Sequence, residues 1–467
     1  MKKDKIAILI FAEGHNREDV YQNRLPIQER EIDKLVKNLN TVFDIDTENI
    51  PEIRSKREGI TQAKIVNGAD AVAVILYIPT FNNPATVAHT TRIINKPMAL
   101  VGNWAKDSMS QLGFLASAGA VSQIGAEVKR VPFDGCTPEA VNTLRLWVNA
   151  VKTKTALEGE TFGCIGGRSL GIATGTANAA QWEKLFGVDI EQIDKLELVT
   201  RANNIDKDVV DQTVAEIKKK YGKVIFSEEN RFTENHLRKM VSSYLAMKSI
   251  VRDYELDFCG IKCQTELSNG YCLQCLTVQM LNDPYDMTGK KNPVVCSCEA
   301  DADGALSMEI LKHISGGKPT ALQDIASIGE NGFVLANCGA MASYFSRLSQ
   351  NMDENLADVY LMPHGFGLAG GAATQFVVAE DIFTFMRLFR IDGEYYMGIF
   401  SGETEKRDRE ELKKYSPYRP TAFVRHKLDV SYFMETFCSN HLHCVQGNYV
   451  QDLIEFCKIM KIKYYVY

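Results

Sequence analysis

KIAILIF, at residues 5–11, is an apolar run of the length of one β-strand, and it decides how the first part of the chain folds. An amphipathic helical pattern follows at residues 28–40, and two further apolar runs are ADAVAVILYI (69–78) and KPMALVGNW (96–104). Short apolar runs that alternate with helical patterns are typical of βαβ units around a parallel sheet. We therefore predict an α/β domain with a doubly wound, Rossmann-like parallel sheet over residues 1–157.

A second series of strand and helix patterns begins with TFGCIGGRSLGIATG at residues 161–175 and includes the charged helical segment DKDVVDQTVAEIKKKYG at residues 206–222. From about Leu361 the sequence becomes rich in strand-like segments that Gly and Pro interrupt. The change of pattern predicts a second doubly wound α/β domain over residues 158–345 and a smaller, more antiparallel, β-rich C-terminal domain over residues 346–467.

Composition limits the class of protein. The 467 residues are 45% hydrophobic and 24% charged, which is typical of a globular protein with several domains. The formal net charge of −6 gives no overall basic field that would attract nucleic acid. The apolar stretch near the N-terminus is too short for a signal peptide, and no run approaches the roughly 20 apolar residues of a membrane span. We expect a cytoplasmic protein that binds neither nucleic acid nor membrane.

Six of the 12 cysteines lie between Cys259 and Cys298, among them the C-x-x-C pair Cys272 and Cys275. A structural zinc site would require two such pairs among turn residues, whereas these cysteines lie in apolar, strand-like sequence. Because a free cysteine packs as a small hydrophobic side chain, we expect reduced thiols in a core. The sequence assigns no further role to this cluster.

Two glycine-rich segments have the spacing of ligand-binding loops but lack their context. HGFGLAGG, from His364, contains G-x-G-x-x-G, yet the sequence after it is strand-like and offers no helix N-terminus to a pyrophosphate. GGRSLG, from Gly166, lacks the Lys of a Walker loop. We interpret both segments as tight turns. Arg168, in the second segment, is a candidate ligand contact, with a surface ion pair as the alternative.

Acidic residues gather in CSCEADADGAL, residues 296–306, between an apolar run and a helix-like one. The segment resembles the first half of a calcium loop, but Ile310 stands where a bidentate Glu would close that loop. Asp301 and Asp303 also form a D-x-D pair of the kind that binds a metal and a nucleotide-sugar in some transferases. Capping of the helix that follows explains the two acids equally well.

Glu299 and Asp324 are the candidates for a functional site on strand ends. A carboxylate at the C-terminal end of a parallel strand lies where α/β proteins bind ligands. Asp324 belongs to another strand-like run, KPTALQDIASI, about 25 residues further along the chain. Neighbouring parallel strands joined by one helix would present two carboxylates at this separation.

The chain resembles the L-fucose isomerase family, whose wider relatives include the L-arabinose isomerases. The resemblance extends over residues 1–467, is weakest at the N-terminus, and implies an aldose–ketose isomerase of the L-fucose/D-arabinose type. Such an enzyme acts on an open-chain sugar through a cis-enediol, and its three-domain subunits form a homo-oligomer, a hexamer or another trimer-based assembly. Four segments carry the resemblance, in this order: GGRSLGIATGTANAAQWEKLFGVDIEQIDKLEL, FCGIKCQTELSNGYCLQCLTVQMLND, CEADADGALSMEILKHISG and ATQFVVAEDIFTFMRLFRIDGEYYMGIFSGE.

The resemblance also implies a divalent metal, usually manganese, with magnesium or cobalt as alternatives, held by a Glu, an Asp and a C-terminal His. By position these are Glu299 and Asp324, which would also carry the proton, and His441 in SNHLHCVQG, with His443 two residues away on the same strand face. Oxygen ligands suit such cations, which support the sugar oxygens while a proton moves between C1 and C2. Asn337 replaces the His that precedes Cys-Gly in arabinose isomerase relatives, which favours the fucose-type ligand set.

The predicted substrate contacts come from several segments. They are Asn440 and His443 beside the metal ligand, Arg17 and Arg24 in an N-terminal segment that would reach a neighbouring subunit's sugar, Arg168, and Gln264. Because QTELSNG, from Gln264, stands where many fucose-type relatives have a Trp after the Cys, the substrate stays open. The alternatives are an isomerase of a modified hexose such as sulfoquinovose and, from another class, a non-catalytic sugar-binding protein. The three candidate metal ligands favour an enzyme.

Overall fold

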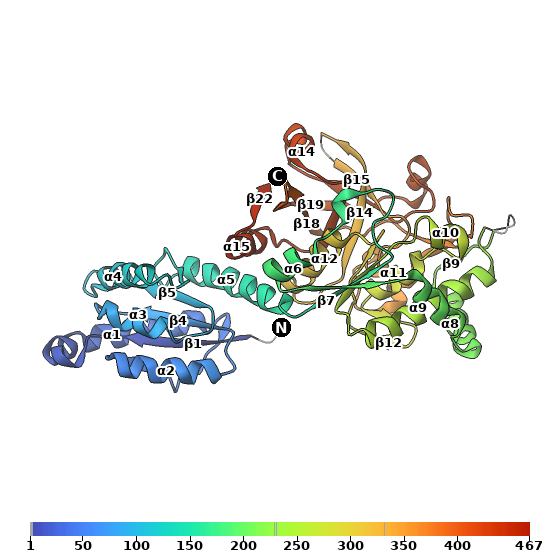
Figure 1. The fold of residues 1–467 in the computed structure, drawn as a ribbon. Coiled ribbons are helices and arrows are strands. Elements are labelled where there is room, and N and C mark those ends of the chain that lie inside the picture. Colours follow the sequence, from blue (N-terminus) through green and yellow to red (C-terminus); the bar gives the residue numbers. More distant parts are fainter. Residues whose placement is uncertain (1–2, 228, 230, 331) are drawn as a thin grey trace. The chain divides into compact units, whose positions relative to one another are not determined.

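The chain forms two compact units in the computed structural model, which describes residues 3–227, 229, 231–330 and 332–467 (Figure 1). The first unit extends to Lys152 and the second begins at Thr153, within the long helix α5 (Pro138–Leu157). None of the helices in these described ranges is long and apolar enough to cross a membrane. A further division of the second unit near residue 345 stays a prediction.

A parallel sheet organises the first unit. Its strands are β1 (Asp4–Phe11), β2 (Phe43–Asp44), β3 (Glu52–Ile53), β4 (Ala73–Ile78), β5 (Met98–Gly102) and β6 (Lys129–Arg130). They pair in the order β2-β1-β4-β5-β6, and β3 pairs with the C-terminal end of β1. The helices are α1 (Glu18–Leu39), α2 (Lys56–Gly68), α3 (Pro84–Thr91), α4 (Ser110–Gln123) and α5, with the short 3-10 helix η1 (His15–Arg17) before α1.

Helices cover both faces of this sheet. Val74 and Leu76 of β4 belong to a core cluster that includes apolar residues of α2, α3 and α4. Tyr77 points to the opposite face, where its hydroxyl donates a hydrogen bond of 3.2 Å to the Glu31 carbonyl of α1. Successive residues of a strand face opposite sides of the sheet, so the two contacts place helices on both sides. The predicted doubly wound fold of this part is confirmed.

The second unit contains another parallel sheet. It comprises β7 (Thr161–Ile165), β8 (Asp189–Ile193), β10 (Phe258–Ile261) and β13 (Cys296–Cys298) in the order β13-β10-β7-β8. Around it lie η2 (Ala173–Gly175), α6 (Ala179–Phe186), α7 (Lys195–Asn203), α8 (Lys207–Lys220), α9 (Glu234–Asp253), α10 (Glu266–Gly270) and α11 (Cys275–Asn282). Smaller pairings join β11 (Tyr285–Asp286) to β12 (Gly289–Lys290), and β16 (Tyr360–Pro363) to β9 (Lys223–Val224) and β17 (Ala372–Gln375).

The β-rich part is a sheet that closes on itself, and its strands pair antiparallel except for β22, which is parallel to β19. Its strands are β14 (Thr320–Gly329), β15 (Gly332–Ala336), β18 (Ile382–Ile391), β19 (Glu394–Glu405), β20 (Thr421–Arg425), β21 (His441–Gln446) and β22 (Lys463–Val466). They follow the order β18-β21-β14-β15-β20-β19-β22, and an additional pairing of β18 with β19 closes the ring. Other elements here are η3 (Ser343–Ser346), α13 (Met352–Ala357), η4 (Arg409–Lys414), α14 (Val430–Thr436) and α15 (Val450–Met460).

β14 corrects one detail of the sequence analysis. Glu299 and Asp324 were predicted to lie at the ends of neighbouring parallel strands, but β13 belongs to the parallel sheet and β14 to the antiparallel ring. β14 pairs with β15 and β21 in antiparallel register. A short strand-like run does not specify which of two sheets the chain enters after a helix, so the sequence alone gave the wrong neighbour.

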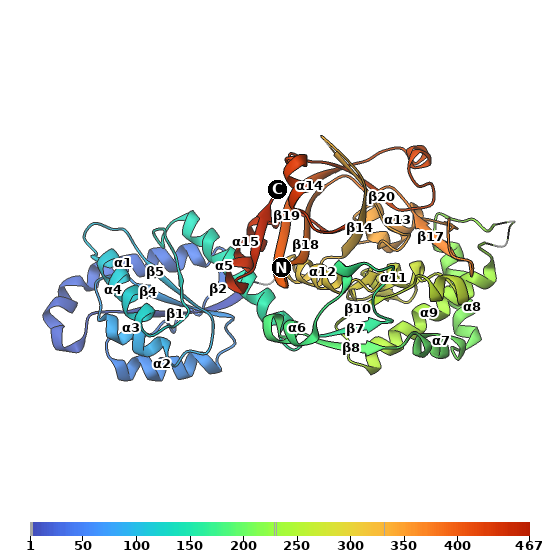
Figure 2. The same cartoon turned by 45° about the horizontal axis from the view of Figure 1, so that its top comes forward.

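Helix α12 (Ala302–Ile314) connects β13 to β14 and packs between the two sheets (Figure 2). Nearly all its residues are buried, which explains why its sequence, ADGALSMEILKHI, is apolar on every side except for a few acids and its basic end. It contacts β10 and β13 of the parallel sheet on one side and β14, β18 and β21 of the antiparallel ring on the other. The residues just before α12 are therefore enclosed by both sheets.

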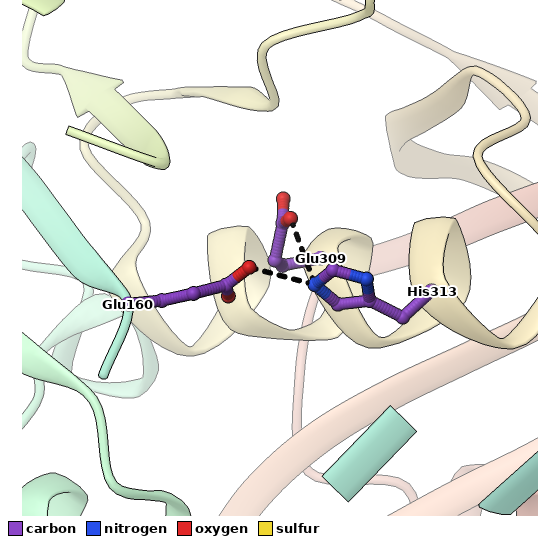
Figure 3. A group of neighbouring side chains, drawn as sticks. All are labelled: Glu160, Glu309 and His313. Atoms are coloured by element: carbon purple, nitrogen blue, oxygen red, sulfur yellow. Dashed lines mark hydrogen bonds and ion pairs between the residues drawn. The ribbon is translucent and has the colours of Figure 1, made fainter. Parts of the chain in front are cut away.

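A charged cluster ties the other end of α12 to the start of β7 (Figure 3). Ligand atoms of Glu160, Glu309 and His313 all lie within 4.8 Å of one another, a spacing that a metal site would also have. His313 Nε2 is 2.8 Å from Glu160 Oε1 and 3.2 Å from Glu309 Oε1, and Lys312 pairs with Glu309 as well. Two carboxylates thus meet two cationic side chains, so the group is a balanced ion network.

His313 should make stability depend on pH. Burial opposes its charge, but hydrogen bonds to Glu160 and Glu309 raise the pKa of His313 to about 9. A histidine whose pKa is raised in the folded state stabilises it fully below the unfolded pKa, near 6.5, and this contribution is lost as pH rises through 9. His313→Gln should therefore lower the free energy of unfolding by about 2 kcal/mol at pH 6 and by much less at pH 10.

Denaturant unfolding at the two pH values measures this difference. His89→Gln, at an exposed position of α3, serves as the control and should leave the unfolding midpoint unchanged at both pH values. Equal destabilisation by His313→Gln at pH 6 and pH 10 would contradict the assignment of a charged His313.

Candidate active site

The three residues predicted as metal ligands converge in the second unit. Glu299 directly follows β13, Asp324 lies in β14, and His441 begins β21. Asp324 and His441 are register partners across β14 and β21, which brings two of the three together. His441 Nε2 lies 3.3 Å from Asp324 Oδ1 and 3.7 Å from Glu299 Oε2. One imidazole nitrogen therefore faces both carboxylates.

The turn that presents Glu299 has an uncommon backbone conformation. Glu299 and Ala300 have φ angles of 61° and 51°, in the left-handed region that residues other than glycine seldom adopt. The Ala300 N–H donates to the Ile261 carbonyl at 3.1 Å, and the Asp301 N–H donates to the Cys298 carbonyl at 3.2 Å. Backbone strain of this kind persists where the surrounding structure holds it, and it gathers at functional sites.

The Glu299 carboxylate is buried and incompletely bonded. Its side chain is 12% exposed, and Oε2 has no hydrogen-bond partner among the described residues. Burial raises the pKa of Glu299 to about 7, and the charges of Asp324 and Asp301 add to this effect against that of His441. A buried oxygen without a partner is costly. An oxygen-rich set with one imidazole and one orphaned carboxylate oxygen fits a hard divalent cation.

The imidazole of His441 is also held at its second nitrogen, Nδ1. Its ring is 1% exposed, and Nδ1 lies 2.7 Å from Asp301 Oδ2. Burial would lower the pKa of His441, but hydrogen bonds to Asp301 and Asp324 raise it to about 10. Burial alone would raise the pKa of Asp301, yet the charge of Arg387 and the hydrogen bond to His441 hold it well below its usual range.

Asp301 and Asp303 do more than cap a helix. Asp301 is the N-cap of α12, where its side chain accepts from the Gly304 N–H at 2.9 Å, and Asp303 lies in the first turn, as predicted. Both acids are also fully buried and ion-paired, with Arg387 and Arg390 respectively. Capping as their whole role is therefore wrong. Removing one partner of a buried pair costs about 3–5 kcal/mol, against roughly 0.3–1 kcal/mol for an acid at a helix terminus.

Three further predicted substrate contacts in this unit, Gln264, His443 and Asn440, have different surroundings. Gln264 lines the same hollow as Glu299, and its Nε2 is 3.8 Å from Cys338 Sγ. His443 is buried, its ring nitrogens have no hydrogen-bond partner among the described residues, and Nε2 packs against Gly304. Asn440 is exposed, and its carbonyl accepts from the Ile325 N–H at 3.0 Å. A substrate role for these residues stays a prediction.

The glycine-rich segments are turns, as interpreted. Arg168 is exposed in the loop after β7, where Gly166 and Gly167 have φ angles of 90° and 77°. The segment from His364 connects β16 to β17. The substrate contact predicted for Arg168 stays a prediction.

Arg17 and Arg24 belong to the first unit. Arg17 Nη1 and Arg24 Nη1 each lie 3.3 Å from a carboxylate oxygen of Glu13, which is buried just after β1. The two arginines thus share one carboxylate at the C-terminal edge of a parallel sheet, where α/β proteins bind ligands. Their predicted contact with a neighbouring subunit's sugar stays a prediction.

Sequence reasoning missed the cysteines around Glu299. Cys263, Cys275, Cys298 and Cys338 line the hollow with it. All 12 cysteines are free, and the six between Cys259 and Cys298 are buried, which confirms the expectation of thiols in a core. A hydrogen bond from Cys298, with one from His364, lowers the pKa of Cys338 to about 5 against the effect of burial. No spacing in the sequence relates Cys338 to the earlier cluster.

Arg387 was also missed, although the sequence carries a signal for it. It lies in FTFMRLF, within a strand whose other residues are mostly apolar, and its side chain is 0% exposed. Arginine is almost never fully buried unless it is paired. An arginine in the middle of such a strand therefore predicts a buried acid somewhere in the chain, which the structure identifies as Asp301.

Comparisons with known proteins agree with this arrangement. Residues 335–467 match the family model for the L-fucose isomerase C-terminal domain. A sulfoquinovose isomerase of Priestia aryabhattai is 24% identical over 240 residues, which are 50% of this chain and 50% of that protein. One of Alkalicoccus urumqiensis is 24% identical over 256 residues, 53% of this chain and 54% of that protein. An L-fucose isomerase of Haemophilus influenzae (strain PittEE) is 24% identical over 243 residues, 46% and 40% respectively.

These alignments span about half the length of the curated relatives. The family model covers the end of the chain that contains His441, and the fold supplies the α/β sheets and the β-rich part that the resemblance implies. Together these findings confirm the resemblance to the L-fucose isomerase family that was read from the sequence.

Proposed function

We propose that this chain is a metal-dependent aldose–ketose isomerase that acts on an open-chain sugar. The observation that carries the proposal is the convergence of Glu299 and Asp324 on Nε2 of His441, with one buried oxygen of Glu299 that has no hydrogen-bond partner in the part of the chain that the structure describes. The names of the relatives, L-fucose isomerase and sulfoquinovose isomerase, support the same reaction class.

Glu299, Asp324 and His441 would hold the cation, with manganese preferred over magnesium or cobalt. When bound, such a cation supplies Lewis acidity toward the sugar oxygens at C1 and C2. Two of the three side chains are nearly closed off from solvent, at 12% exposure for Glu299 and 1% for His441, while Asp324 is 30% exposed. Asp324 therefore marks the side from which a sugar would enter.

The two carboxylates are also the groups that would move the proton. Isomerisation takes a proton from C2 of the aldose and returns one to C1, through a cis-enediol and with no net oxidation or reduction. A side chain that does this must lie within hydrogen-bond reach of the carbon-bound hydrogen. Glu299 and Asp324 both lie near the same imidazole nitrogen, so a sugar bound there would be close to both carboxylates.

The L-fucose/D-arabinose type is the first candidate for the substrate, and one observation favours the sulfoquinovose type as a second. Arg419 is half-buried, lies 6.0 Å from the ring of Phe366 in the same hollow as Glu299, and forms no ion pair with any carboxylate of the described residues. The charges of Cys338, Tyr418 and Asp324 raise the pKa of Arg419 against the effect of burial. An arginine without an acidic partner suits the sulfonate of a modified hexose.

A homo-oligomer and a cytoplasmic location stay predictions. Arg17 and Arg24 would contribute to a sugar site only through a neighbouring subunit in such an assembly. Light scattering would give the mass of the assembly directly.

Metal removal should abolish the reaction. Treatment with a chelator should stop ketose formation, and manganese should restore it better than zinc, because the ligands are two carboxylates and one imidazole. The assay should cover L-fucose, D-arabinose and sulfoquinovose, each with and without manganese. Full activity of the metal-free protein would contradict the proposal. Tight sugar binding without any ketose in the presence of manganese would favour the sugar-binding protein instead.

Replacing either carboxylate should remove most of the activity. Glu299→Gln and Asp324→Asn should each keep the fold and lower kcat by at least about a hundredfold, the low end of what a general acid or base contributes. Steady-state kinetics and circular dichroism measure both properties. Glu403→Gln, at an exposed position of β19, is the control and should retain activity. Near-normal turnover of both site variants would reject these residues as proton carriers.

Manganese binding should release protons in a way that depends on pH. Metal ligands must be deprotonated, and in the metal-free protein the pKa of Glu299 is about 7 and that of His441 about 10. Binding should therefore release close to two protons at pH 6 and about one at pH 8.5. Calorimetry in buffers of different ionisation enthalpy counts these protons. His441→Gln should release about one proton fewer at each pH, and unchanged counts would argue against His441 as a ligand.

A further inference from the structure

A continuous chain of buried hydrogen bonds leads from β18 to the imidazole of the proposed site. Arg387 Nη1 donates to Asp301 Oδ2 at 2.5 Å, and Nη2 donates to Oδ1 at 3.0 Å, so the guanidinium grips both oxygens. Asp301 Oδ2 in turn lies 2.7 Å from His441 Nδ1. Arg387 and Asp301 are 0% and 1% exposed, so water does not compete with these contacts.

Each oxygen of Asp301 has two partners. Oδ1 accepts from the Gly304 N–H at the start of α12 and from Arg387 Nη2, and Oδ2 accepts from Arg387 Nη1. An ionised carboxylate can only accept, so the remaining contact of Oδ2 requires that His441 Nδ1 donates its proton. The neutral imidazole that binds a metal then has its free lone pair on Nε2, which is the nitrogen that faces Glu299 and Asp324.

The support around Asp301 is fixed by secondary structure. Asp301 is the N-cap of α12, and Arg387 lies within β18, where its Nη2 also donates to the Thr174 carbonyl at 2.6 Å. Asp301 therefore cannot turn away from His441 without breaking bonds at both of its oxygens. Carboxylates placed in this way behind a ligating histidine fix its tautomer and ring orientation.

We propose that Asp301, anchored by Arg387, is a positioning residue that holds His441 with its proton on Nδ1 and so keeps Nε2 free to bind the metal. This role rests on the proposed function, because it assumes that His441 is a metal ligand. Asp301 itself points away from Glu299 and Asp324, toward the far side of the imidazole, and would touch neither the cation nor the sugar.

Asp301→Asn tests the role with almost no change of shape. Asparagine still suits an N-cap, and its amide oxygen would stay at the Oδ1 position, because the Gly304 N–H there can only donate whereas His441 Nδ1, beside Oδ2, can also accept. Its NH2 group then replaces Oδ2 and donates toward His441 Nδ1. The imidazole is forced to carry its proton on Nε2, which removes the ligand. The variant should bind Mn²⁺ about 10–100-fold more weakly, measured by electron paramagnetic resonance of the free ion.

Asp303→Asn is the matched control. Asp303 lies two residues after Asp301, in the first turn of α12, is equally buried, and pairs with Arg390 at 3.0 Å and with the Tyr395 hydroxyl at 2.8 Å. It makes no contact with His441 among the described interactions. Asp303→Asn should therefore lose stability as a buried pair does and keep the Mn²⁺ dissociation constant of the unmodified protein.

Pulsed electron paramagnetic resonance gives a second readout that a merely structural role would not change. Mn²⁺ in the unmodified protein and in Asp303→Asn should show modulation from a coordinated imidazole nitrogen, which Asp301→Asn should lose or weaken. If Asp301→Asn folds poorly because Arg387 is left unpaired, Asp301→Asn with Arg387→Met removes the buried charge as well. The Gly304 N–H still holds the amide oxygen in that double variant, so the same loss of Mn²⁺ affinity is expected.

The outcomes separate this role from the proposed function. A folded Asp301→Asn protein with unchanged Mn²⁺ affinity and imidazole modulation overturns the positioning role, whether or not sugars are isomerised. If the unmodified protein binds Mn²⁺ through an imidazole, Asp301→Asn weakens that binding, and no sugar is converted, the positioning role is supported and the proposed reaction fails. Unmodified protein that binds Mn²⁺ without any imidazole signal overturns the role of His441 and with it that of Asp301.

Discussion

The buried ion pair between Arg387 and Asp301 joins the two kinds of sheet in the second unit. Asp301 begins α12 directly after the parallel sheet, whereas Arg387 lies 86 residues further along the chain, in β18 of the antiparallel ring. If α12 packed against the ring in another way, both charges would be buried without a partner, which would destabilise the fold by several kcal/mol. The pair thus favours one docking of the helix. Glu299, two residues before Asp301, takes its place from that docking.

The parallel sheets can be predicted from the sequence because each of their strands has its own local sequence pattern. KIAILIF and its successors are apolar runs bounded by helical patterns, and each can be recognised without knowing its neighbour. β14 is different, because its run TALQDIASIG would suit a parallel or an antiparallel partner. One of its two neighbours is β21, and Asp324 pairs there with His441, more than a hundred residues away. A pairing between strands so far apart in the sequence leaves no local signal. The alternating strand and helix pattern of the preceding segment therefore led to the assignment of β14 to the parallel sheet, which is wrong.

The candidate site shows the same difference between contacts that are close in the sequence and contacts that are distant in it. Strand-end reasoning singled out Glu299 and Asp324, the family resemblance added His441 and the role of metal ligand, and in the structure both carboxylates lie near Nε2 of His441. Asp301 looked like a helix cap because its nearest partner in the sequence, the Gly304 N–H, is three residues away. Its other partners, Arg387 and His441, lie on strands of the ring. Local reasoning therefore found the first contact of Asp301 and could not find the two that connect it to the site.

The acids around α12 also differ in how completely they are bonded, and this difference locates the chemistry. Asp303 meets an arginine and a tyrosine hydroxyl, and Asp301 meets four donors. Glu299 stands on a strained turn, one of its buried oxygens has no hydrogen-bond partner within the described ranges, and it adds a further negative charge next to Asp324. A folded chain keeps such an unsatisfied group where its surroundings fix it and where a ligand of the folded state compensates the cost. The docking of α12 supplies the first condition, and the proposed cation would supply the second.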